Sequence, residues 1–159
     1  MKTRITSILV PIDFSRGSAA ALRFAKVMAR QTGATLALVN VIDDVTMPDL
    51  WPAAHTPSVP EIRDAMADGA RQKLSRLCNA AGDLPMIWDV MFGVPAAVIV
   101  RRAKQRSYDL VIIGTHGRTG VRRLLMGSVA ERVARLSPCP VVLVRDRRPP
   151  SRVIGKKHA

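Results

Sequence analysis

The chain has 159 residues, 48% of them hydrophobic and 23% charged, and a formal net charge of +13. This length fits one globular domain that buries roughly 70% of its unfolded surface and needs no metal or disulfide staple. No apolar run reaches the ~18 residues of a membrane helix, and the first run stops at Pro11 and Asp13, too early for a signal peptide, so we expect a soluble cytoplasmic protein with no membrane insertion.

The first half of the chain alternates strand and helix patterns. Residues 6–13 predict a buried parallel strand, because their apolar residues are continuous rather than alternating. Residues 15–33 predict a helix capped by Ser15 and ended by Gly33. Residues 34–42 predict a second buried strand. Four prolines within 46–60 then indicate a long surface loop.

The second half continues the alternation. We predict helices over 61–81, 95–106 and 129–136, and strands over 86–92, 108–113 and 141–144. The apolar face expected for the helix over 61–81 consists of Ile62, Ala65, Met66, Ala70, Leu74 and Leu77. The outer face expected for the helix over 95–106 consists of Arg101, Arg102, Lys104 and Arg106. Cys78 and Cys139 lie far apart in no metal-binding pattern, which favours two small buried hydrophobes.

This alternation predicts an α/β fold with a single parallel open sheet of five strands and helices on both faces. Ligands of such sheets bind beyond the carboxyl ends of the strands, where the winding reverses. A strand order of 3-2-1-4-5 would make the first and fourth strands neighbours. Asp13 would then face the glycine-bearing loop that follows residue 113.

That loop, residues 114–128, leads from a buried strand into a helix. Gly114 and Gly117 let the backbone turn sharply and approach a ligand without a Cβ in the way. We expect Ser128 to be the N-cap of the helix and to form a capping box with Glu131, although its hydroxyl can instead bond a phosphate oxygen. A helix N-terminus offers unpaired N–H groups and a positive dipole end, which suits a phosphate.

The spacing G-x2-G-x9-G-S in this loop resembles the ATP-binding branch of the universal stress protein family. The segments 8–15 and 138–144 add to the resemblance, which covers about residues 4–145. It implies a Rossmann-like fold similar to the adenine-nucleotide alpha hydrolases, with ATP as the ligand, with or without Mg²⁺. It also implies a homodimer whose two copies pair through residues 141–144.

The resemblance further implies a set of binding residues. The nucleoside would contact Pro11, Asp13, Val41 and Ile113. The ribose and phosphates would contact Gly114, His116, Gly117, Gly127, Ser128 and Val129, the last three through backbone N–H groups and the serine hydroxyl. Ala130 departs from the family pattern, because many members place a threonine hydroxyl there.

We find no pattern typical of a nucleophilic triad, a metal-ligand cluster or a pair of catalytic carboxylates. We therefore predict a nucleotide-dependent stress-response or signalling protein with at most slow ATP hydrolysis, and we assign no catalytic or metal-binding residues. The alternative is an interaction module whose basic surface and tail bind a partner such as nucleic acid. An enzyme of the wider nucleotide-activating group is the least supported, because we find no residues for a second substrate.

The basic charge is concentrated near the C-terminus. Residues 145–159 hold six lysines and arginines, and residues 117–127 hold three more arginines. No aromatic residues interleave with the basic ones in the tail, so it offers no stacking platform for bases. We predict a domain over 1–146 and a solvated, partly disordered tail over 147–159.

Overall fold

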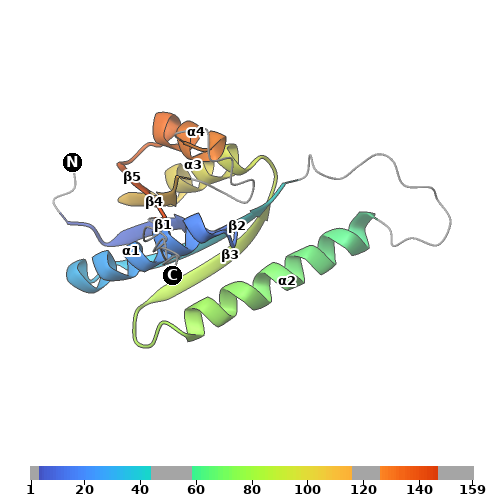
Figure 1. The fold of residues 1–159 in the computed structure, drawn as a ribbon, viewed down its shortest axis with the longest axis horizontal. Coiled ribbons are helices and arrows are strands. Elements are labelled where there is room, and N and C mark those ends of the chain that lie inside the picture. The colour runs from blue at the N-terminus through green and yellow to red at the C-terminus, as the bar shows by residue number, and fades with distance from the viewer. Residues whose placement is uncertain (1–3, 44–58, 116–125, 147–159) are drawn as a thin grey trace, which may run out of the picture.

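A computed structural model describes residues 4–43, 59–115 and 126–146 of the chain. These residues form one parallel sheet with the strand order β3-β2-β1-β4-β5 (Figure 1). The strands are β1 Ser7–Pro11, β2 Thr35–Ile42, β3 Met86–Phe92, β4 Leu110–Gly114 and β5 Val141–Val144. The helices are α1 Arg16–Thr32, α2 Val59–Asn79, α3 Pro95–Gln105 and α4 Ser128–Leu136. The predicted fold class and strand order are confirmed.

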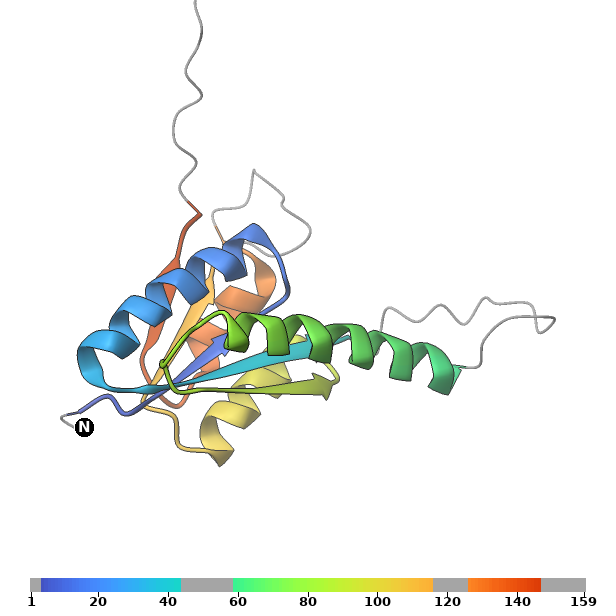
Figure 2. The same ribbon diagram turned by 90° about the horizontal axis from the view of Figure 1, so that it is seen from below.

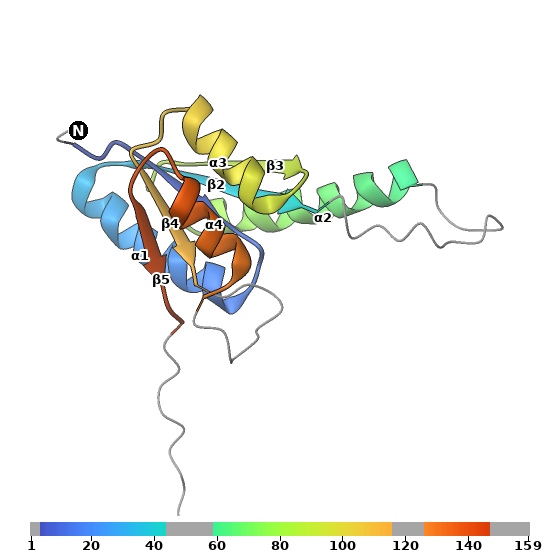
Figure 3. The same ribbon diagram turned by 90° about the horizontal axis from the view of Figure 1, so that it is seen from above.

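Helices cover both faces of the sheet (Figures 2 and 3). Ile8, Leu36 and Ile112 face one core, which Ala25 of α1 and Leu74 of α2 complete. The other core lies between the opposite face of the sheet and the helices α3 and α4. Because the central strands are buried on both faces, their sequences are continuously apolar.

The ends of α1 follow the sequence prediction. The Ser15 hydroxyl accepts a hydrogen bond from the N–H of Ser18 at 3.1 Å. Gly33 adopts a left-handed φ of 74° and donates its N–H to the carbonyl of Ala29. These two caps set the length of the helix that crosses over from β1 to β2.

The second helix differs from the prediction at its start and on its buried face. It begins at Val59, so Pro60 lies in its first turn, where the missing N–H costs no hydrogen bond. Ala67, Ala70 and Leu74 are buried, whereas Ala65 and Met66 are exposed. The physical reason is that the N-terminal part of α2 extends beyond the sheet, as Figure 2 shows.

The prediction for Arg102 of α3 is wrong as well. Its side chain is only 18% exposed, and its Nη2 donates to Oδ2 of Asp89 in β3 at 2.8 Å. Helical periodicity alone could not reveal this ion pair, because its acceptor lies on another element.

The predicted division at residue 146 stays a prediction. Residues 147–159 lie outside the described residues, and so do 44–58, which contain most of the predicted loop with Trp51 and His55.

Asp109 ties β1 to β4 at the amino edge of the sheet. Its Oδ2 accepts hydrogen bonds from the backbone N–H groups of Thr6 at 2.9 Å and Ser7 at 3.1 Å. The same oxygen accepts from the hydroxyls of Thr6 at 2.8 Å and Ser7 at 3.1 Å. One carboxylate therefore holds the two central strands next to each other.

At the carboxyl edge, α1 and β4 approach each other through two glycines. A Cβ added to Gly114 would lie 2.5 Å from the carbonyl carbon of Gly17, which is closer than any real side chain tolerates. Gly114 is therefore required by this packing, and not by the sharp turn that the sequence suggested. The contact seats the first turn of α1 against the end of β4.

We predict that Asp109→Ala lowers the free energy of unfolding by about 1.5–3 kcal/mol, because the charged acceptor of four hydrogen bonds is lost. Urea denaturation measures the change. The control is Asp68→Ala, which removes a carboxylate that is 65% exposed and should change stability by less than about 1 kcal/mol. Equal losses in the two variants would contradict the role of Asp109.

We predict that Gly114→Ala destabilises the fold by about 1–3 kcal/mol, because the new methyl group forces the backbone of α1 away. Gly69→Ala is the matched control. It lies inside α2 with nothing within 4 Å of an added Cβ, so it should stabilise the protein by about 0.5–1 kcal/mol. Thermal melting of both variants tests this difference in sign.

Candidate functional site

The neighbours β1 and β4 create the point where the winding of the sheet reverses. Ile8 aligns with Leu110, and Leu9 aligns with Val111. From the carboxyl ends of these strands the chain leaves toward α1 on one face and α4 on the other (Figure 3). Open α/β sheets bind their ligands at such a point.

The chain that follows β1 is held firmly before it reaches Asp13. The buried Asn40 donates from Nδ2 to the carbonyl of Ile12 at 2.7 Å, and the N–H of Ile12 donates to the carbonyl of Val39 at 2.8 Å. Phe14 then adopts a φ of 62°, a conformation that non-glycine residues rarely take. This turn fixes the direction in which the chain enters α1.

Asp13 is half-buried within this turn. Its Oδ1 accepts a hydrogen bond from the N–H of Ser15 at 3.0 Å. Its Oδ2 has no hydrogen-bond partner within the described parts of the chain. Asp13 therefore offers one fixed acceptor at the edge where β1 meets β4.

Three of the predicted apolar residues lie near this edge. Ile113 is buried, and Val41 is half-buried against the same core, on the face that α3 and α4 cover. Pro11 is buried, and the alternation of the strand places it on the same face as Leu9. The structure thus places Pro11, Val41 and Ile113 on one face of the sheet, at the carboxyl ends of their strands, and their role as a wall for the base stays a prediction.

Thr115 joins the two ends of the loop that follows β4. Its N–H donates to the carbonyl of Val144 at 2.9 Å, and its carbonyl accepts from the N–H of Gly127 at 2.7 Å. These bonds place Gly127 next to the end of β4. His116 and Gly117 lie outside the described residues, as do Arg118, Arg122 and Arg123.

The start of α4 corrects two predictions. The N-cap is Gly127, with a φ of −72° and a ψ of 148°, and Ser128 is the first helical residue. The capping box of Ser128 with Glu131 is therefore wrong. In this structure the N–H of Gly127 donates to the carbonyl of Thr115, and the phosphate contact that the resemblance implied for Gly127 stays a prediction. The cause of both differences is this tertiary hydrogen bond, which starts the helix one residue early.

The first turn of α4 keeps four donors for an anion. The first intrahelical bond runs from the N–H of Glu131 to the carbonyl of Gly127, so the N–H groups of Ser128, Val129 and Ala130 have no intrahelical acceptor. Within the described residues, the Ser128 hydroxyl makes no hydrogen bond. We call these four donors the α4 anion site, and the helix dipole adds positive potential to it.

Ala130 enters this site in a way that the sequence did not indicate. The residue is 3% exposed and belongs to the core, while its N–H lies in the first turn and has no acceptor among the described residues. A pattern of side chains could not reveal this donor, because it is a backbone N–H group. The helix boundary is the signal that would have revealed it.

The described residues contain no group of three or more histidines, cysteines or acidic residues that could hold a metal ion. Cys78 and Cys139, which the sequence predicts to be small buried hydrophobes, are half-buried, and each packs against one of the two cores. Burial raises the pKa of the Cys78 thiol, against the opposing effect of Lys26, so this cysteine is a poor nucleophile. Among the described helices, none has the length and apolar character needed to cross a bilayer.

Comparisons with known proteins agree with this architecture. Universal stress protein MJ0531 of Methanocaldococcus jannaschii is 31% identical over 138 residues, which cover 87% of this chain and 81% of that protein. The structure of universal stress protein UspA from Lactobacillus plantarum matches with a TM-score of 0.79 and 28% identity, over 91% of this chain and 100% of that one.

Two solved structures with lower identity share the fold and are described with a nucleotide. A universal stress protein in complex with cAMP matches 90% of this chain and 98% of its own, with 22% identity and a TM-score of 0.61. An Arabidopsis thaliana family protein with AMP bound matches 92% of this chain and 97% of its own, with 17% identity and a TM-score of 0.61.

The profile of the universal stress protein family matches residues 4–145 of this chain. With the strand order, the switch point and the helix start described above, this match shows that the chain belongs to the universal stress protein family.

Proposed function

We propose that this protein binds ATP at the carboxyl edge of β1 and β4, with the phosphates on the α4 anion site. The observation that carries the proposal lies at the start of α4, where the first N–H groups and the Ser128 hydroxyl have no hydrogen-bond partner among the described residues. The nucleotides named for two relatives, cAMP and AMP, support an adenine nucleotide as the ligand.

The nucleoside end would lie against the wall formed by Pro11, Val41 and Ile113. The Oδ2 of Asp13 is an acceptor for an N–H or O–H of the nucleoside, because Oδ1 is already bonded to Ser15. By the family resemblance, Gly114, His116 and Gly117 would line the path between the two ends.

Mg²⁺ would enter this site with the nucleotide. The described residues offer N–H and O–H donors to the phosphates but no cluster of metal ligands, so the phosphates themselves would hold the ion. We assign no catalytic residue and propose a nucleotide-dependent stress-response or signalling protein with at most slow ATP hydrolysis. The second candidate function, an interaction module with a basic surface, draws on the net charge of +13.

We also propose a homodimer through β5. This strand forms one edge of the sheet, and Leu143 is 39% exposed on it. An apolar edge strand is a hazard unless another strand covers it. Pairing of β5 with β5 of a second copy would cover this edge in both copies.

Isothermal titration of the full chain with ATP tests the proposal, and two variants separate the donors. Ser128→Ala removes the hydroxyl alone and should weaken binding by about 1–3 kcal/mol. Ser128→Pro also removes an N–H and should weaken binding further. Proline is favoured at the first helical position, and Gly127 before it is already extended, so α4 should remain folded.

Ser137→Ala is the matched control, because it removes a serine hydroxyl from the opposite end of α4. Its ATP affinity should equal that of the unmodified protein. An absence of binding heat and of a thermal shift at millimolar ATP would refute the proposed function. If the two Ser128 variants bind ATP as tightly as the control, the start of α4 is not part of the ATP site.

A second prediction concerns Asp13. Asp13→Asn retains an oxygen that can accept from the N–H of Ser15, but it replaces the second acceptor by an NH₂ donor. We expect the melting temperature to change little and the ATP affinity to fall by about 1–3 kcal/mol. A fall in both quantities would instead indicate that Asp13 serves the turn alone.

A further inference from the structure

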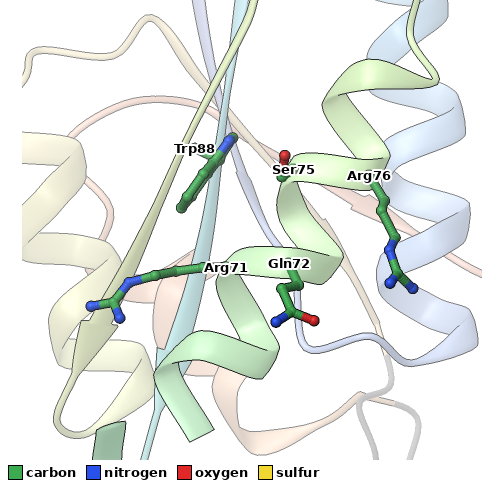
Figure 4. A pocket seen from close by; sticks show the side chains of 5 residues that line it. All are labelled: Arg71, Gln72, Ser75, Arg76 and Trp88. Carbon is green, nitrogen blue, oxygen red and sulfur yellow. The ribbon is translucent and has the colours of Figure 1, made fainter. Parts of the chain in front are cut away.

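A second candidate site lies between α2 and β3. The strand β2 separates β3 from the pair β1 and β4, so this site is distinct from the α4 anion site. A hollow there is lined by Arg71, Gln72, Ser75 and Arg76 of α2 and by Trp88 of β3 (Figure 4). The chain has only two tryptophans, and aromatic residues make up 4% of it. An exposed indole in one hollow with two arginines is therefore an unusual arrangement for this chain.

Trp88 lies where the core ends. It shares its face of β3 with Met86 and Val90, which pack against the core under α1 and α2. The indole nevertheless remains 39% exposed, because β3 is the edge strand and α2 covers it incompletely. A large flat apolar surface is thus left open to a partner.

Two arginines of α2 supply positive charge at this hollow. Arg71 donates from Nη1 to Oδ1 of Asp68 at 2.7 Å, which leaves most of its five N–H donors for another acceptor. Arg76 is exposed and makes no ion pair within the described residues. The two guanidinium groups extend to opposite sides in Figure 4, from positions about 7.5 Å apart along the helix axis.

We propose that this hollow binds single-stranded nucleic acid. One base stacks on the indole of Trp88, and the phosphates on either side of that base bind Arg71 and Arg76. Gln72 and Ser75 lie between the arginines and supply donors and acceptors for the base edge. The net charge of +13 attracts the polyanion. A duplex would not fit, because its base faces are already stacked.

An acidic peptide is the competing occupant. The outer edge of β3 pairs with no other described strand, so a peptide could add to it as a further strand. Such a peptide would neutralise the arginines, but it would place no flat ring against the indole. The combination of an aromatic face with cations favours a base and its phosphates.

The stacking is tested with a fluorescein-labelled oligothymidine of about 12 nucleotides and the full chain, by fluorescence anisotropy. Trp88→Ala should weaken binding about 5- to 100-fold. Ile87→Ala is the matched control, since this neighbour on β3 is 55% exposed and lies on the opposite face of the strand. Equal affinities of the two variants would overturn the proposal, because the attraction would then come from the charge of the chain as a whole.

The arginines are tested through the salt dependence of the same binding. Arg71→Ala with Arg76→Ala should flatten the slope of log affinity against log salt by about 1.4, since each phosphate contact on a single strand contributes about 0.7. Lys104→Ala with Arg106→Ala removes the same charge from exposed positions at the C-terminal end of α3 and should leave the slope unchanged. Equal changes in both double variants would overturn the assignment.

The fluorescence of Trp88 distinguishes the occupants. In a Trp51→Phe background Trp88 is the only indole in the chain. Oligothymidine should quench its emission, whereas poly-glutamate and a DNA duplex should not. Quenching by poly-glutamate alone would overturn the proposal in favour of a peptide. Saturating ATP should not displace the oligonucleotide, and displacement would show that both ligands compete for one site.

Discussion

The close approach of Gly17 and Gly114 is the constraint on which the carboxyl edge of this molecule depends. No side chain fits between the two backbones, so the first turn of α1 lies directly against the end of β4. That contact sets the position of the turn holding Asp13 relative to Thr115. Asp13 and Thr115 are thus brought to one edge by a contact between two backbones.

Thr115 extends this arrangement to α4 and β5. Its N–H is bonded to Val144 and its carbonyl to Gly127, so one residue connects the end of β5 with the start of α4. The proposed phosphate site and the proposed dimer edge are therefore both hydrogen-bonded to the backbone of Thr115.

The two proposed sites use the positive charge of the chain differently. The α4 anion site relies on backbone N–H groups and a helix dipole and needs no basic side chain among the described residues. The hollow at Trp88 relies on two guanidinium groups and an aromatic face. A nucleotide and a single strand can therefore be recognised at separate edges of one sheet, because different groups recognise their phosphates.

The sequence by itself determined the alternation of strands and helices along the chain and the caps of α1. Those features follow from apolar runs, from the conformations of glycine and proline, and from local hydrogen bonds, all of which a short segment expresses alone. The family resemblance then named the expected ligand and its residues.

Only the tertiary structure decided the features that depend on two distant segments. The bond between Gly127 and Thr115 moved the start of α4 and undid a capping box that Ser128 and Glu131 would form locally. Asp89 drew Arg102 inward, and the extent of the sheet beneath α2 left Met66 exposed. Trp88 and the arginines of α2 meet only because β3 lies beneath that helix, a relation between elements that no local pattern encodes.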